Sequence, residues 1–83
     1  MINRKNYSDE LYKISFSIGG LELNKINKQV KNLLNRTDST FTITELSQQL
    51  VVIIELPIQN IPDYVGMFIN EGLALYEIKE INN

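Results

Sequence analysis

The sequence predicts an α+β fold in which a four-stranded antiparallel sheet carries two helices on one face. Three observations lead to this prediction: apolar and polar residues alternate in three segments, a fourth short segment is almost continuously apolar, and two further segments repeat apolar residues with the period of a helix. At 83 residues there is room for one domain with one core. We therefore expect a flexible N-terminal segment at residues 1–10 and a single domain at residues 11–83.

A pair of glycines separates the first strand from the first helix. Residues 12–18 alternate between apolar and polar side chains, which predicts a strand with one buried face, and Gly19 and Gly20 end it. Asn24 is the expected N-cap, because its side-chain oxygen can accept hydrogen bonds from the free amides of a first helical turn. The apolar stripe of the helix that follows consists of Ile26, Val30, Leu33 and Leu34.

The middle of the chain predicts two strands joined by a short loop. Residues 40–46 alternate, with Phe41 and Ile43 facing one way and the threonines facing the other. Residues 47–49 form the expected hairpin loop. Residues 50–56 are apolar except for Glu55, which is typical of a strand that is covered on both faces or nearly so.

The last third predicts a second helix and a fourth strand. The segment Asn60-Ile61-Pro62-Asp63 favours a helix start, with Asn60 or Ile61 at the cap, a proline in the first turn and an acidic residue at the positive end of the helix dipole. Gly72 is the expected left-handed residue that ends this helix. Residues 73–81 then alternate, with Leu75 and Glu77 on one face and Tyr76 on the other.

The resulting order is β-α-β-β-α-β. Two right-handed crossovers that share one antiparallel sheet give the split βαβ, or ferredoxin-like, arrangement with two helices on one face. The other sheet face is expected to be bare. The residues expected to pack against the helices are Ile14, Phe16, Phe41, Ile43, Val52, Ile54, Tyr76 and Ile78.

Composition argues against several classes of function. The chain contains no histidine and no cysteine, which removes the commonest general base, the thiolate nucleophile and the usual zinc ligands, and its carboxylates are scattered along the chain. We therefore expect no enzyme, no metal and no cofactor. The net charge of −2 predicts no nucleic-acid partner. No apolar run approaches the length of a membrane span, so we expect a cytoplasmic chain with no direct membrane insertion.

RNA recognition is a specific possibility, because RNA-recognition motifs share this element order. Those domains stack bases on aromatic side chains that point out of the two central strands. None of the outward positions of the corresponding strands is aromatic here, and this argues against RNA binding. These positions are Lys13, Ser15, Ser17, Val51, Ile53 and Glu55.

The bare face of the sheet is the predicted interaction surface. Val51, Ile53 and Leu75 are expected to form an apolar patch there, with Glu77 among the polar residues around it. Small monomers seldom leave such a patch in water, so a protein partner or a second copy, in a homodimer, is expected to cover it. The alternative is an isolated apolar ridge on a threonine-rich sheet, which needs no partner.

The turn at Gly19 and Gly20 is the second candidate surface. Amides of a glycine turn before a helix attract anions. A P-loop requires a following Lys-Ser/Thr pair and a dinucleotide fingerprint requires three spaced glycines, and neither is present. The residues themselves therefore favour a plain turn.

The last third of the chain resembles a known family. The segments are LVVIIEL at residues 50–56, NIPD at residues 60–63 and NEGLALYEIK at residues 70–79. They resemble the C-terminal accessory domain of ATP-binding subunits of bacterial drug- and bacteriocin-export ABC transporters. The resemblance implies a regulatory or interaction domain without ATP-site residues. The chain has no Walker A lysine, so either it is an excised domain or the likeness is one of structure alone.

A second resemblance concerns the glycine turn. Residues 17–21, with the sequence SIGGL, are similar to the first strand–helix turn of ACT-type domains, which bind small molecules such as amino acids there. The acidic residue that precedes the glycine in that family is missing. The leading expectation is thus a non-enzymatic regulatory or protein-interaction domain that uses the open sheet face or the strand edges. The alternative is an ACT-like sensor of small molecules with Gly19 and Gly20 at its ligand turn.

Overall fold

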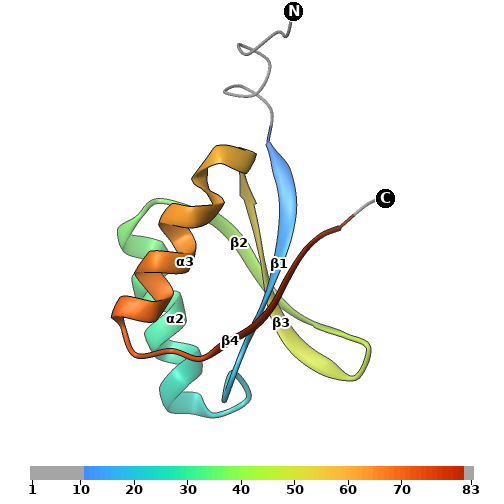
Figure 1. The fold of residues 1–83 in the computed structure, drawn as a ribbon. Helices are drawn as coiled ribbons and strands as arrows, with labels where there is room; N and C mark the ends of the chain where they lie inside the picture. The colour runs from blue at the N-terminus through green and yellow to red at the C-terminus, as the bar shows by residue number, and fades with distance from the viewer. Residues whose placement is uncertain (1–10, 82–83) are drawn as a thin grey trace, which may run out of the picture.

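The computed structural model describes residues 11–81, and their strands and helices follow the predicted order (Figure 1). The predicted flexible segment at residues 1–10 lies outside the described residues. The elements are β1 (Tyr12–Ile18), α2 (Asn24–Arg36), β2 (Thr40–Leu46), β3 (Gln49–Leu56), the short 3-10 helix η1 (Ile58–Asn60), α3 (Ile61–Asn70) and β4 (Leu75–Glu80). The predicted α+β fold class is confirmed.

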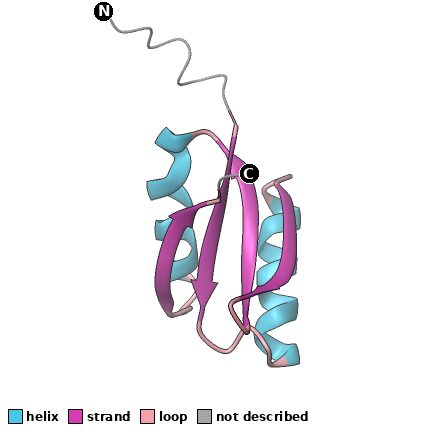
Figure 2. Cartoon of the chain, turned by 90° about the vertical axis from the view of Figure 1, so that its right-hand side faces the viewer, coloured by secondary structure: helices cyan, strands magenta, loops and turns pink. Residues whose placement is uncertain are grey.

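The four strands form one antiparallel sheet in the order β2-β3-β1-β4. The helices lie together on one side of this sheet in Figure 1. Figure 2 looks onto the other side, where the strands lie in front of both helices. This is the ferredoxin-like βαββαβ arrangement, with β2 and β4 at the two edges of the sheet.

The hairpin between β2 and β3 is tighter than the sequence predicts. Leu46 pairs directly with Gln49, so the loop contains only Ser47 and Gln48. Both loop residues have positive φ angles, 52° and 66°, which is the backbone of a type I′ turn. This turn twists in the same sense as the strands it joins, so it holds β2 and β3 in one regular register over their whole length.

Helix α2 begins without the predicted cap. Leu23 occupies the N-cap position, no side chain caps the first turn, and Asn24 is already helical, so the expectation of an Asn24 cap is wrong. A turn closed by the Leu23 amide and the Gly20 carbonyl (2.8 Å) leads directly into the helix. The side chain of Asn27 stabilises the segment that leads into the helix by donating to the Leu21 carbonyl at 3.2 Å.

Helix α3 begins and ends as predicted. Asn60 occupies the N-cap position, a proline stands in the first turn, and Asp63 is the acidic residue there. Gly72 has a φ angle of 78°, and the amide of Leu73 donates to the Phe68 carbonyl at 3.1 Å across it. A glycine in this left-handed conformation satisfies carbonyls that the end of a helix leaves free.

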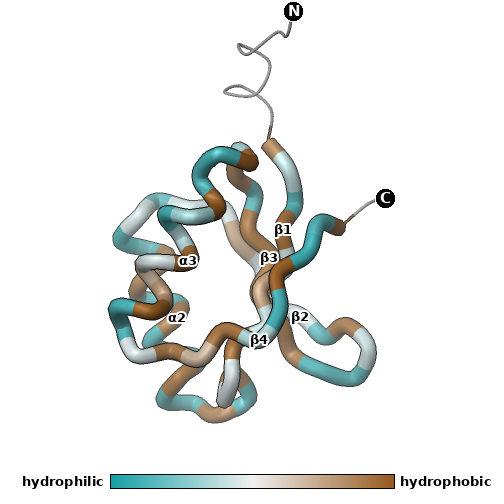
Figure 3. Tube along the Cα trace, in the orientation of Figure 1, coloured by the Kyte–Doolittle hydropathy of each residue, from teal (hydrophilic) through white to brown (hydrophobic). Residues whose placement is uncertain are grey.

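The hydrophobic core lies between the helices and one face of the sheet. Phe16 at the centre of β1 meets Phe68 of α3 edge to face, with ring centroids 5.4 Å apart. Figure 3 shows hydrophobic stretches of β1 and β3 in the middle of the sheet. The buried residues of this core are Ile14, Phe16, Ile18, Leu21, Val30, Leu33, Leu34, Val52, Ile54, Leu56, Phe68 and Leu73.

Candidate functional site

The strand register places every open-face residue. Residues that are directly opposite each other in a sheet project to the same side, so the pairing of the strands defines rows of neighbours across the open face. One row runs Thr42–Ile53–Ser15–Lys79. Two further pairs on this face are Thr44 with Val51 and Ser17 with Glu77. None of these residues is aromatic.

An apolar patch on the open face lies over β2 and β3. Val51 is only 4% exposed yet is not part of the core cluster, because it faces away from the helices. Ile53 is half-buried beside it along β3. Leu46 follows Thr42 and Thr44 at intervals of two residues along β2, so its side chain projects to the same face of the sheet. It lines one small hollow together with Val51. We call Leu46, Val51 and Ile53 the open-face patch.

Leu46 is the residue of this patch that the sequence interpretation missed. The signal was present, because the residue follows Thr40, Thr42 and Thr44 at the same period of two. It was obscured by the position of Leu46 at the end of its strand. The two-residue turn extends the pairing of β2 and β3 to Leu46 itself, and this keeps its side chain in the open-face register.

Leu75 is not part of this patch. Simple alternation predicts it on the open face, but the structure pairs it with the core residue Ile18 and packs it against the core. The cause is a register shift between Ser17 and Ile18, which changes the phase of β4 by one residue where the strand begins. Glu77 keeps its place on the open face opposite Ser17.

The same shift and the edge position of β4 change two further predictions. Tyr76 was expected against the helices but is 72% exposed. Ile78 does lie opposite Phe16 on the helix side, yet it is 37% exposed, because the helix layer covers this outer strand only in part. Strand β4 therefore contributes Leu75 to the core and little else.

Serines line the middle of the open face. Ser15 and Ser17 of β1 are 2% and 3% exposed although no described helix covers them. Their neighbours on both sides carry longer side chains, Ile53 on one side and Lys79 on the other for Ser15. The two serines line a small hollow of about 40 Å³ between the open-face patch and the charged residues of β4. A second hollow of about 200 Å³ lies beside it, lined by Lys13, Thr40, Phe41, Thr42, Ile53 and Glu55.

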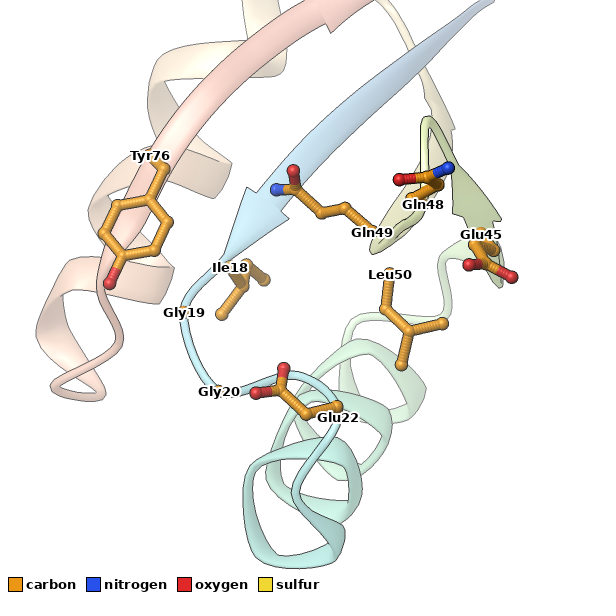
Figure 4. A pocket seen from close by; sticks show the side chains of 9 residues that line it. All are labelled: Ile18, Gly19, Gly20, Glu22, Glu45, Gln48, Gln49, Leu50 and Tyr76. Carbon is orange, nitrogen blue, oxygen red and sulfur yellow. The ribbon is translucent and has the colours of Figure 1, made fainter.

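The second candidate surface is a broad hollow of about 600 Å³ at the end of the sheet (Figure 4). In Figure 4 the glycine turn and Glu22 lie below it, Tyr76 of β4 stands on one side, and the β2–β3 hairpin stands on the other. Both predicted ligand-turn residues, Gly19 and Gly20, line it. The complete lining is Ile18, Gly19, Gly20, Glu22, Glu45, Gln48, Gln49, Leu50 and Tyr76.

The chemistry of this hollow does not suit an anion. Its two charged lining residues, Glu22 and Glu45, are both carboxylates. The Gly19 amide already donates to the Ala74 carbonyl at 2.9 Å, and the Leu21 amide donates to the Ile18 carbonyl at 3.3 Å. A phosphate would therefore meet like charge and few free donors. A neutral or cationic ligand with amine or hydroxyl donors fits the carboxylates and side-chain amides better.

Metal binding and membrane insertion find no support in the part of the chain that the structure describes. Residues 11–81 contain no group of three or more acidic, histidine or cysteine side chains placed to hold a metal ion. Within the same range, no helix has both the length and the apolar character needed to cross a bilayer.

Comparison of the chain with protein-family models, with curated proteins and with solved structures finds no match. The fold and its surfaces thus define a class, a small ferredoxin-like α+β domain with one open sheet face.

Proposed function

We propose that this chain is a non-enzymatic protein-interaction domain that binds another protein through the open face of its sheet. One observation carries the proposal: the open-face patch lies on a face that no described helix covers, where Leu46 and Ile53 are partly exposed and Val51 is buried beside them. Apolar side chains that gather on an uncovered sheet favour association with another surface.

The proposed role is regulatory. The resemblance of residues 50–79 to the accessory domain of ABC-transporter ATP-binding subunits supports this role, because it implies a regulatory or interaction domain without ATP-site residues. In that setting the domain works in the cytoplasm, on the side of the membrane where ATP is bound. The chain needs no cofactor for this role. A non-enzymatic role also agrees with a chain that has neither histidine nor cysteine.

Ile53→Lys tests the open face. Ile53 is half-buried, so a lysine there can reach solvent, whereas a charge at the fully buried Val51 would disturb the sheet itself. The matched control is Ile58→Lys, which places the same charge on an exposed apolar residue of η1, outside the open face. Both variants should keep the circular dichroism spectrum of the wild-type chain.

The readout compares the proteins that the three chains retain from extracts of the source cells. A partner held by the wild-type chain and by Ile58→Lys, but lost by Ile53→Lys, supports the proposal. Equal retention by Ile53→Lys contradicts it. Light scattering of the purified chains then separates a foreign partner from a second copy on the open face, because only a second copy bound there would make the solution mass of the pure protein fall in Ile53→Lys and not in Ile58→Lys.

The second candidate function is the binding of a small molecule such as an amino acid at the Gly19–Gly20 turn. The hollow of about 600 Å³ beside that turn favours it. A ligand that binds the native state must raise the melting temperature. Thermal shift against amino acids and nucleotides tests this candidate, with Tyr76→Ala as the control that opens one wall of the hollow. The absence of any shift at millimolar concentration would count against a sensor.

A further inference from the structure

The two edges of the sheet differ in how well they are protected against pairing with another strand. Charged side chains and irregular pairing are common protections of an edge strand. Strand β4 has both, since it carries Glu77, Lys79 and Glu80 and has a register shift against β1. Strand β2 has neither, because it pairs with β3 in an unbroken register and its one charged residue is Glu45, near its end.

The backbone groups on the outer edge of β2 can be assigned from the hairpin. In a two-residue hairpin the flanking residues, here Leu46 and Gln49, exchange hydrogen bonds with each other. Hydrogen-bonded and non-hydrogen-bonded pairs then alternate along the ladder. The amides and carbonyls of Phe41, Ile43 and Glu45 therefore point away from β3, toward the outer edge. No strand within residues 11–81 pairs with them there.

We propose that β2 pairs with β2 of a second copy of this chain, in an antiparallel two-fold arrangement centred on Thr42. This register joins the outward-pointing backbone groups of the two copies. It places Phe41 opposite Ile43 of the second copy on the helix side, which extends both cores. On the open face it places Thr42 opposite Thr42 and Thr40 opposite Thr44. Pairs of aromatic with β-branched residues, and of threonine with threonine, are favourable across strands.

The sequence of β2 favours pairing with a second copy in this register over the register centred on Ile43. Shifting the centre to Ile43 would place Phe41 opposite the Glu45 carboxylate of the second copy, which is a poorer neighbour for a half-buried ring. With Thr42 at the centre, each Glu45 lies opposite Ser39, and no like charges meet. The strand is therefore complementary to itself, and the joined sheet has eight strands with all four helices on one face.

This association is independent of the proposed function, because it uses the strand edge and leaves the open face free. Ile53 lies on β3, one strand in from the edge, so Ile53→Lys should leave the edge dimer intact. A chain that keeps its dimer and loses its partner supports both proposals. If the wild-type chain does not dimerise but still binds its partner, only the proposal of edge pairing is contradicted.

Thr42→Cys is the most direct test, because the natural chain contains no cysteine that could react in its place. Two residues on the two-fold axis in a non-hydrogen-bonded pair have Cα atoms about 4.5 Å apart. That separation lies within the range a disulfide requires. The matched control is Thr40→Cys, which is exposed on the same face of the same strand. Its two copies would lie about 14 Å apart along the strands, too far for a disulfide.

Under mild oxidation Thr42→Cys should convert largely to a reducible covalent dimer, while Thr40→Cys should remain mostly monomeric on denaturing gels. The proposal is overturned if Thr42→Cys forms covalent dimers no faster than Thr40→Cys does. A wild-type chain that light scattering finds monomeric up to millimolar concentration also overturns it.

A charge pair at the same position provides a second, non-covalent test. Thr42→Lys and Thr42→Glu each place two like charges opposite each other on the axis, so each variant alone should be monomeric. An equimolar mixture should recover the dimer mass in native mass spectrometry, and this recovery shows that both variants are folded. The proposal is overturned if either variant alone dimerises as the wild-type chain does, or if the mixture stays monomeric.

Discussion

The phenol ring of Tyr76 lies against the backbone of Gly19, where β1 ends. A Cβ atom added to Gly19 would come within 2.8 Å of the Tyr76 hydroxyl and 3.0 Å of its Cζ. The contact joins the edge strand β4 to the glycine turn and forms one side of the hollow described above. As long as the Tyr76 ring keeps this position, it leaves no room for a Cβ atom at Gly19, but the ring is exposed and can move.

Gly19→Ala should therefore have a small effect on stability. The added methyl group would push against Tyr76, which is largely exposed and can rotate into solvent, so we expect a loss of about 1 kcal/mol or less in urea unfolding. Combining the change with Tyr76→Ala should remove the loss, since nothing then opposes the methyl group. A loss of several kcal/mol that persists in the double variant would mean that the backbone, and not the ring, requires the glycine.

Gly20→Ala and Gly66→Ala should change stability in opposite directions. Gly20 has a φ of 78°, and an added Cβ would lie 3.3 Å from Ile26 Cγ1, so alanine should cost about 1–2 kcal/mol. Gly66 lies within helix α3, and an added Cβ there meets no atom within 4 Å. Alanine at that position should stabilise the protein by about 0.5–1 kcal/mol. Urea midpoints of the two variants measure both effects, and a shift in the same direction would contradict the assignment of these backbone conformations.

Leu75→Lys should destabilise the fold far more than Tyr76→Lys. Leu75 packs against the core, so a lysine there loses apolar contacts and must find a path to solvent, and we expect a loss of about 2 kcal/mol. Tyr76 is exposed, so its substitution should change stability by about 0.5 kcal/mol or less. Simple alternation along β4 predicts the reverse order. Thermal unfolding of the two variants thus tests the register shift.

Tyr64→Phe should weaken the link between α3 and the end of α2. The Tyr64 hydroxyl lies 2.6 Å from Ser39 Oγ, which lies 2.5 Å from Thr37 Oγ1, and Thr37 in turn donates to the Leu34 carbonyl. Loss of one such hydrogen bond should cost about 0.5–1.5 kcal/mol. Ser39→Ala should have a similar effect. In a double-mutant cycle by urea unfolding the two losses should overlap, and full additivity would show that the pair does not interact.

Much of the fold could be predicted from local patterns. The alternation in residues 12–18 and 40–46, the helical stripe at Val30, Leu33 and Leu34, and Gly72 at a helix end all depend on neighbours in the chain. The candidate surfaces were predicted less completely. Val51 and Ile53 lie on the open face as expected, but Leu46 replaces Leu75 beside them, because the phase of β4 depends on how it pairs with β1.

By itself, the sequence determined the kinds of element, their order and the faces of β1, β2 and β3. These follow from periods of two and 3.6 residues, which are set by local backbone geometry. The tertiary structure decided that β2 is the edge strand without protection against pairing with another strand. It also decided where Leu75 and Tyr76 point and how far the helices cover β4. Those features depend on hydrogen-bonded pairing and packing between residues far apart in the chain, and no local period encodes them.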